Sequence, residues 1–149
     1  MKKAKYTAKQ VAQWFINRSA FDAKLDNGEF LSNLKLQKLL YYAQGVHLAM
    51  KNEPLFNDEI VAWGHGPVIK SVYNNYKGEM AIQTEDDVSI DNETLLLLEE
   101  VYKVFGQYSA WKLRDMTHEE DPWRNTKQND EIPQSLIKGY FEKHWVTNT

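Results

Sequence analysis

The sequence predicts a mainly α-helical fold of about six helices around a central helix at about residues 32–51, with a minor short β element. The segment at 34–51 has the longest helical periodicity of the chain, and at about 100° per residue it is apolar on most of its circumference. Several shorter amphipathic segments surround it in sequence. A helix that is apolar on most sides is usually enclosed by other elements. We expect its main apolar stripe to hold Leu36, Leu39, Leu40, Ala43, Val46, His47 and Met50.

Length and composition favour one compact domain. The chain has 149 residues, of which 42% are hydrophobic and 13% aromatic, and this is enough for one domain over 1–149 with its core at about 7–142. No apolar run approaches the ~20 residues needed to span a bilayer. The first ten residues are basic but lack the apolar core of a secretory signal. A cytoplasmic protein without membrane contact is therefore expected.

Charge and cysteine content exclude several function classes. The chain contains no cysteine, which rules out disulfides, thiol catalysis and thiolate metal sites. Its formal net charge is −3, and this argues against nucleic-acid binding, which depends on neutralising phosphates. Residues 1–51 hold nine of the 18 basic side chains but only three of the 21 acidic ones. The acidic second part suits a basic partner surface.

The first half of the chain has clear helix signals. Thr7 begins the first helix, with Gln10 in capping-box spacing, and this helix is expected to fade after Arg18. Ser32 is the expected N-cap of the central helix. The Asn-Glu-Pro segment at 52–54 ends that helix, because proline cannot continue its hydrogen bonds.

The middle of the chain combines a strand, a tight turn and further helices. Residues 59–63 have the short branched pattern of a strand, and Pro67 after the following turn is expected to open a helix over 68–76. Residues 81–84 and 88–90 suit either a small hairpin or a loop. The remaining helices are expected from Asp91 or Asn92 to Gly106, from Ser109 and from Pro133, with a polar loop at 117–123.

No residue pattern indicates catalysis, a metal site or a cofactor. His47 lies in an apolar stripe and is expected to be structural, whereas His65 lies in a tight turn between two glycines. The acidic run after His118 does not have the spacing of a known metal motif, and a solvated loop is the better interpretation. No serine lies in a nucleophile-elbow context, and no glycine-rich loop has phosphate-binding spacing. These negative results favour a binding module.

Three stretches together resemble the Panacea domain, the SocA-like or GepA-like domain of antitoxin and phage-associated proteins. They are LKLQKLLYYAQGVHLAMKNEPLF at 34–56, EIVAWGHGPVIKSVYNNYK at 59–77 and LRDMTHEEDPW at 113–123. The motif positions that carry over are Lys38, Leu39, Tyr41, Tyr42, Ala43, Gln44, Trp63, Gly66, Pro67, Val68, Tyr73, His118, Glu119, Pro122 and Trp123.

The resemblance implies a non-enzymatic antitoxin of a type II toxin–antitoxin system. Such a protein neutralises its cognate protein toxin, encoded by an adjacent gene, by direct binding; homo-oligomerisation is left open. The alternatives are a proteolytic adaptor that delivers the toxin to a protease, and a metal-dependent hydrolase built on His65, His118 and Glu119.

The same resemblance and the helical pattern supply two sets of candidate residues. The partner-binding candidates are the narrow polar strip of the central helix and the polar or aromatic motif residues outside it: Gln37, Lys38, Tyr41, Gln44, His65, His118, Glu119 and Trp123. The motif positions expected to be structural are Leu39, Tyr42, Ala43, Trp63, Gly66, Pro67, Val68, Tyr73 and Pro122.

Overall fold

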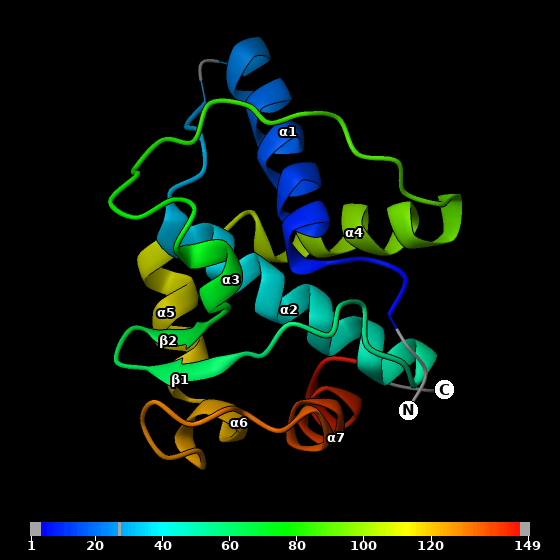
Figure 1. Ribbon diagram of the computed structural model, residues 1–149, viewed down its shortest axis with the longest axis vertical. Helices are drawn as coiled ribbons and strands as arrows, with labels where there is room; N and C mark the ends of the chain where they lie inside the picture. The colour runs from blue at the N-terminus through cyan, green and yellow to red at the C-terminus, as the bar shows by residue number, and fades with distance from the viewer. Residues whose placement is uncertain (1–3, 27, 147–149) are drawn as a thin grey trace.

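A central helix organises the architecture, which is mainly α-helical as predicted. The structure is a computed structural model that describes residues 4–26 and 28–146. Within these residues α2 (Asn33–Lys51) runs through the middle of the molecule, with α1 and α4 above it, α7 below it and α5 near its first turns (Figure 1). Four of the helices that pack on α2 are longer than one turn: α1 (Ala8–Asp26), α4 (Asn92–Phe105), α5 (Ala110–His118) and α7 (Gln134–His144).

Both ends of α2 lie where the sequence predicts them. The Ser32 side chain accepts a hydrogen bond from the Lys35 backbone N–H at 3.2 Å, which satisfies one of the free donors of the first turn. At the other end Asn52 adopts a left-handed conformation with φ 58°, and its N–H donates to the Leu48 carbonyl. Every residue from Leu36 to Gly45 is buried, so α2 is enclosed on all sides over this stretch.

Helix α1 extends further than predicted. Its start is confirmed, since Thr7 and Gln10 exchange side chain to backbone hydrogen bonds at 2.9 and 3.2 Å. The expected end after Arg18 is wrong, because the helix continues to Asp26. The reason is tertiary: Ser19, Ala20 and Ala23 are buried, and the Arg18 guanidinium binds Asp22 one turn later and also Glu99 of α4.

The strand prediction is confirmed, but the helix predicted from Pro67 is wrong. β1 (Val61–Trp63) pairs antiparallel with β2 (Gly66–Val68), and Pro67 lies opposite Ala62. Proline is tolerated here because Ala62 bonds on its other side, donating to the Asp130 carbonyl and accepting from the Asn129 N–H. The helix that follows, α3 (Lys70–Tyr73), is a single turn.

The segment between α3 and α4 is a loop, the second of the two alternatives. Ile82 makes an isolated bridge to Leu31, with its N–H donating to the Leu31 carbonyl at 2.7 Å, and residues 83–91 form no strand. Asp91 then caps α4 by accepting from the Thr94 N–H at 2.9 Å.

The predicted polar loop at 117–123 is also wrong, because it comprises the end of α5 and the short helix α6 (Asp121–Arg124). Pro122 lies in the first turn of α6, where its missing N–H leaves no bond unmade. None of the described helices is long and apolar enough to cross a membrane.

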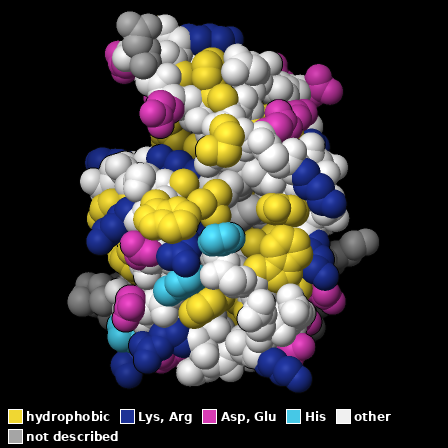
Figure 2. Space-filling view, turned by 90° about the vertical axis from the view of Figure 1, so that its left-hand side faces the viewer, with side chains coloured by type: hydrophobic (Ala, Val, Ile, Leu, Met, Phe, Trp, Pro, Cys, Tyr) yellow, Lys and Arg dark blue, Asp and Glu magenta, His cyan; other side chains and the backbone are white. Residues whose placement is uncertain are grey.

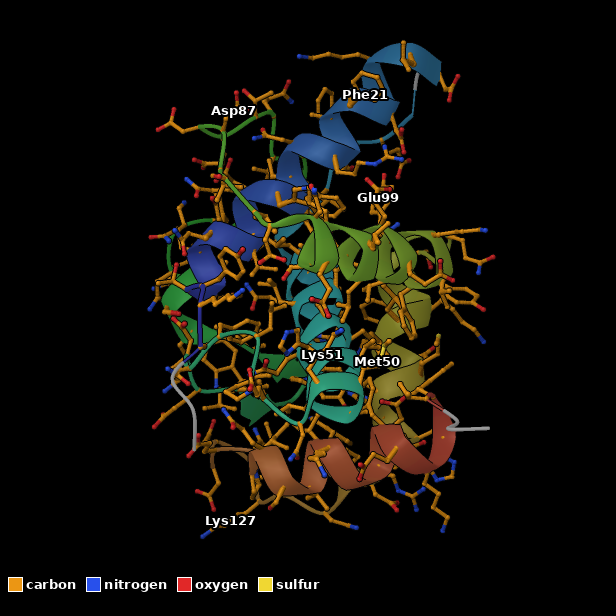
Figure 3. All side chains as sticks on the ribbon, turned by 90° about the vertical axis from the view of Figure 1, so that its right-hand side faces the viewer. Phe21, Met50, Lys51, Asp87, Glu99 and Lys127 are labelled. Carbon is orange, nitrogen blue, oxygen red and sulfur yellow. The ribbon has the colours of Figure 1, made fainter. Side chains whose placement is uncertain are left out.

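One member of the predicted apolar stripe is outside the core. Met50 is 55% exposed near the C-terminal end of α2, where it lies beside Lys51, between α4 and α7 (Figure 3). Lys51 forms an ion pair there with Glu93 of α4. His47, expected in the core, is half-buried, and its Nδ1 lies 2.6 Å from the Glu53 carbonyl oxygen.

Candidate functional site

The predicted exposed strip of the central helix does not exist. Gln37, Lys38, Tyr41 and Gln44 are each at most 1% exposed. Neighbouring elements cover all four positions, since α5, α7 and β2 pack on α2. The expectation that these side chains are available at the surface is therefore wrong. Each of them instead has a polar partner inside the protein.

The two glutamines hold backbone segments against α2. The Gln37 side chain accepts from the Ile69 N–H at 2.8 Å, and its amide donates to Asn33. Gln44 accepts from the Leu55 N–H and donates to the Phe56 carbonyl, both at 2.7 Å. These bonds satisfy buried backbone groups that lie outside helices and strands. Both glutamines thus serve the scaffold.

Lys38 is a buried cation under the β-hairpin. Its Nζ donates to the Pro67 carbonyl at 2.9 Å. Burial lowers the pKa of Lys38 to about 7, and the nearby Arg114 charge acts in the same direction. The hairpin can close over this lysine because Gly66, at φ 109°, has no side chain; a Cβ there would lie 2.7 Å from the Lys38 Cε.

A second buried charge, Glu120, joins α2 to the C-terminal part of the chain. Its carboxylate accepts hydrogen bonds from the hydroxyls of Tyr41 at 3.1 Å and Tyr42 at 3.0 Å, and from the Trp145 indole at 3.1 Å. Burial raises the pKa of Glu120 to about 7, although the three donors oppose the shift. Burial also raises the pKa values of both tyrosines, so they remain donors.

Sequence reasoning missed Glu120, which it assigned to a solvated acidic run. The available signal was its position inside the third motif, two residues before a proline that is typical of a helix start. Glu120 occupies the N-cap position of α6, and it is only 3% exposed.

His118 and Trp123 attach the hairpin to α5 and α6. The two rings stack at 4.0 Å between centroids, and the Trp123 indole donates to the Trp63 carbonyl at 2.7 Å. Burial lowers the pKa of His118, and Arg114 acts in the same direction. Its Nε2 is buried without a hydrogen-bond partner among the described residues. Glu119, by contrast, is exposed.

His65 and Trp111 form an exposed group at the hairpin tip. Arg114 of α5 donates from Nε to His65 Nδ1 at 3.2 Å, and its guanidinium lies over the Trp111 ring at 4.5 Å. The His65 and Trp111 ring centroids are 6.0 Å apart. Trp111 is nevertheless 56% exposed, so a large aromatic surface is held in a defined position but faces outward.

A groove of about 1220 Å³ runs from this aromatic group to the start of α2. One end is lined by Trp63, His65 and Trp111, and the other by the end of α1 and the segments at 28–35 and 78–80. On this face, seen from the side of α5 and the hairpin, hydrophobic side chains form a band across the middle, histidine side chains lie against the band and acidic side chains lie above it (Figure 2). Of the predicted partner-binding residues, only Gln37 and His65 line the groove.

The residues proposed for a metal-dependent hydrolase do not form one site. No three His, Asp or Glu side chains in ranges 4–26 and 28–146 are grouped as metal ligands. His65 binds Arg114, His118 stacks on Trp123, and Glu119 points to solvent.

Comparison with known proteins gives a partial match to one curated relative. A 43-residue stretch is 54% identical to Antitoxin SocA of Caulobacter vibrioides (strain NA1000 / CB15N), covering 29% of this chain and 23% of that protein. No solved structure matches the chain. The model of the family described as "Antitoxin SocA-like, Panacea domain" matches residues 36–124, more than half of the chain and most of the segments that carry the resemblance. This chain therefore belongs to the SocA-like Panacea family.

Proposed function

We propose that this protein is the antitoxin of a type II toxin–antitoxin pair and neutralises a cognate protein toxin, encoded by the adjacent gene, by binding it directly. Family membership supports the antitoxin role. The observation that carries direct binding is the groove of about 1220 Å³ with the exposed, fixed Trp111 at one end. Tryptophan and arginine are the side chains that most often dominate the energy of protein interfaces.

The dimensions and chemistry of the groove favour a polypeptide as the ligand. Its volume exceeds the range of about 300–1,000 Å³ that is usual for small-molecule sites. Lys38 and Glu120, whose pKa values burial shifts to about 7, lie beneath the surface and are bonded to structural partners. The groove therefore offers contact surface, and its acid and aromatic groups serve recognition.

Neutralisation requires only that the toxin's active site or substrate groove be covered. A standard interface buries about 1,600 Å² in total, and a few well-packed aromatic anchors can make it tight. Stoichiometric occlusion then suppresses the toxin without chemistry, and the antitoxin acts as a non-enzymatic binding protein.

Co-expression with the product of the adjacent gene tests this function. We expect the full chain to restore growth of cells that express that product and to co-purify with it. The proposal is refuted if the chain neither restores growth nor co-purifies with that product. Measuring the toxin's half-life in the same cells then distinguishes blocking from delivery to a protease: occlusion leaves the half-life unchanged or longer, whereas an adaptor shortens it.

A further inference from the structure

The end of the groove opposite Trp111 is acidic, and its carboxylates form no ion pair within residues 4–26 and 28–146. Asp26 at the end of α1, Glu29 in the following connection and Glu79 after α3 all line the groove and are exposed. None of the three forms an ion pair with a described residue. The carbonyl end of the α1 dipole adds negative potential beside Asp26.

The basic side chain among the described residues that line the groove is Lys35, and it already has a partner. Lys35 lines the groove and lies in the field of Glu29, but its Nζ donates to the Gly106 carbonyl at 2.7 Å. Burial lowers the pKa of Lys35 as well, which weakens its hold on a proton. Among the described residues, none of the three carboxylates is therefore ion-paired, and a cation supplied by a partner would be attracted to them.

The aromatic end is preorganised to receive an apolar side chain. The Arg114 guanidinium covers one side of Trp111 and donates to His65, so both rings are fixed before anything binds. Trp63 is fixed too, with its ring edge-on to Tyr73 at 5.0 Å. Fixed aromatic surface binds at a low cost in conformational entropy.

We propose that the groove binds one segment of the toxin that carries Lys or Arg at one end and a large apolar side chain at the other. The basic side chain lies at Asp26, Glu29 and Glu79, and the apolar side chain packs on Trp111. The two chemically different ends fix the direction of the segment. This inference rests on the proposed function and specifies the partner's chemistry at the groove.

The test measures binding kinetics between the purified full chain and the product of the adjacent gene. The charge variant is D26N/E29Q/E79Q, and its matched control D87N/E100Q/E131Q removes three exposed acidic charges elsewhere. We expect the charge variant to slow association about tenfold at low salt and to flatten its salt dependence. The control should stay within about twofold of wild type, since steering depends on local charge.

The aromatic end is tested by W111A in the same assay. We expect its dissociation rate to rise by about tenfold or more, because truncating an aromatic anchor acts mainly on dissociation. Thermal melting of each variant confirms that it is folded. A charge variant indistinguishable from its control, or a W111A variant that dissociates like wild type, would overturn the groove assignment while leaving toxin binding intact.

Two further outcomes show whether the proposed function or only the toxin's place in the groove is wrong. If wild-type protein does not bind the adjacent gene product, the proposed function fails and the groove assignment fails with it. If sedimentation velocity of the protein alone shows a dimer that W111A dissociates, the groove holds a second copy of this chain, and the inference about the toxin is overturned.

Discussion

Replacing Lys38 by Met should raise the free energy of unfolding near neutral pH, by an amount that falls as the pH increases. The lysine is fully buried, and its ammonium has the Pro67 carbonyl as acceptor at 2.9 Å. A buried cation with one neutral acceptor loses more solvation than it regains. Methionine has a similar volume and no charge, so it removes that cost without opening a cavity.

The magnitude follows from the pKa of Lys38, which burial lowers to about 7 from 10.5. At about 1.4 kcal/mol per pKa unit, this shift corresponds to roughly 5 kcal/mol of lost stability below pH 7. The variant leaves the Pro67 carbonyl without its donor, at a cost of about 1–3 kcal/mol. Since replacing buried charges by apolar side chains has gained about 1–4 kcal/mol elsewhere, we expect a net gain of about 1–3 kcal/mol at pH 7.

The pH dependence gives the sharper test. Between pH 7 and 10.5 the unfolded lysine keeps its proton, whereas the folded lysine has released it. The penalty is therefore complete below pH 7 and falls by about 1.4 kcal/mol per pH unit above it. The advantage of Lys38→Met should be constant from pH 6 to 7 and should vanish or reverse by pH 9.

Urea unfolding at pH 6, 7, 8 and 9 gives the free energy of unfolding of wild type and of Lys38→Met. The titration of groups that both proteins share cancels in the difference between the two values. Lys77→Met, which changes an exposed lysine, is the control, and its free energy of unfolding should differ from that of wild type by about zero at each pH. A gap for Lys38→Met that is the same at pH 6 and pH 9 would show that the lysine is not held with a depressed pKa.

Three further substitutions test other buried contacts. The pKa of Glu120 is raised to about 7, so between pH 4.5 and 7 the folded protein holds a proton on Glu120 that the unfolded chain has lost. Wild type should therefore lose about 3 kcal/mol of stability from Glu120 between pH 4.5 and 7. Urea titrations of Glu120→Gln should lack this loss. Gly45→Ala places a Cβ 2.4 Å from the Phe141 ring and should cost about 1–3 kcal/mol by thermal melting, whereas Gly139→Ala, with open space around it, should be neutral or slightly stabilising. Gly66→Ala combines φ 109° with a clash and should cost about 2–4 kcal/mol; unchanged melting would contradict the tight hairpin closure.

Local signals in the sequence were sufficient to place the central helix and most helix starts. The α2 helix follows from periodicity and from Ser32, and Asp91 and Ser109 cap α4 and α5 by the same side-chain chemistry. These features depend on residues within a few positions of each other. Elements that depend on distant partners were mispredicted. The second half of α1 is held by α4, and Pro67 is tolerated in a strand because Ala62 bonds to Asn129 and Asp130, far away in the sequence.

The candidate site was harder to predict for the same reason. A polar strip on an apolar helix normally faces water, and this rule led Gln37, Lys38 and Gln44 to be assigned to the surface. Their partners are backbone groups of the hairpin region and of the segment after α2, which no periodicity within the helix can reveal. Trp111 and the acidic residues of the groove lie outside the three motif stretches, and no regular spacing connects them in the sequence. Only the fold brings them together.

The separation between motif and groove has a mechanistic consequence. Motif residues such as Lys38, Tyr41 and Gln44 are inside the protein, where their polar groups bind the hairpin, Glu120 and the segment after α2. The proposed contact residues, such as Trp111 and Glu79, lie on the surface that this scaffold holds in place. Substitutions in the first set should change the free energy of unfolding, with toxin affinity per folded molecule largely retained. Substitutions in the second set should change toxin binding and leave the melting temperature unaltered, because they remove no buried contact.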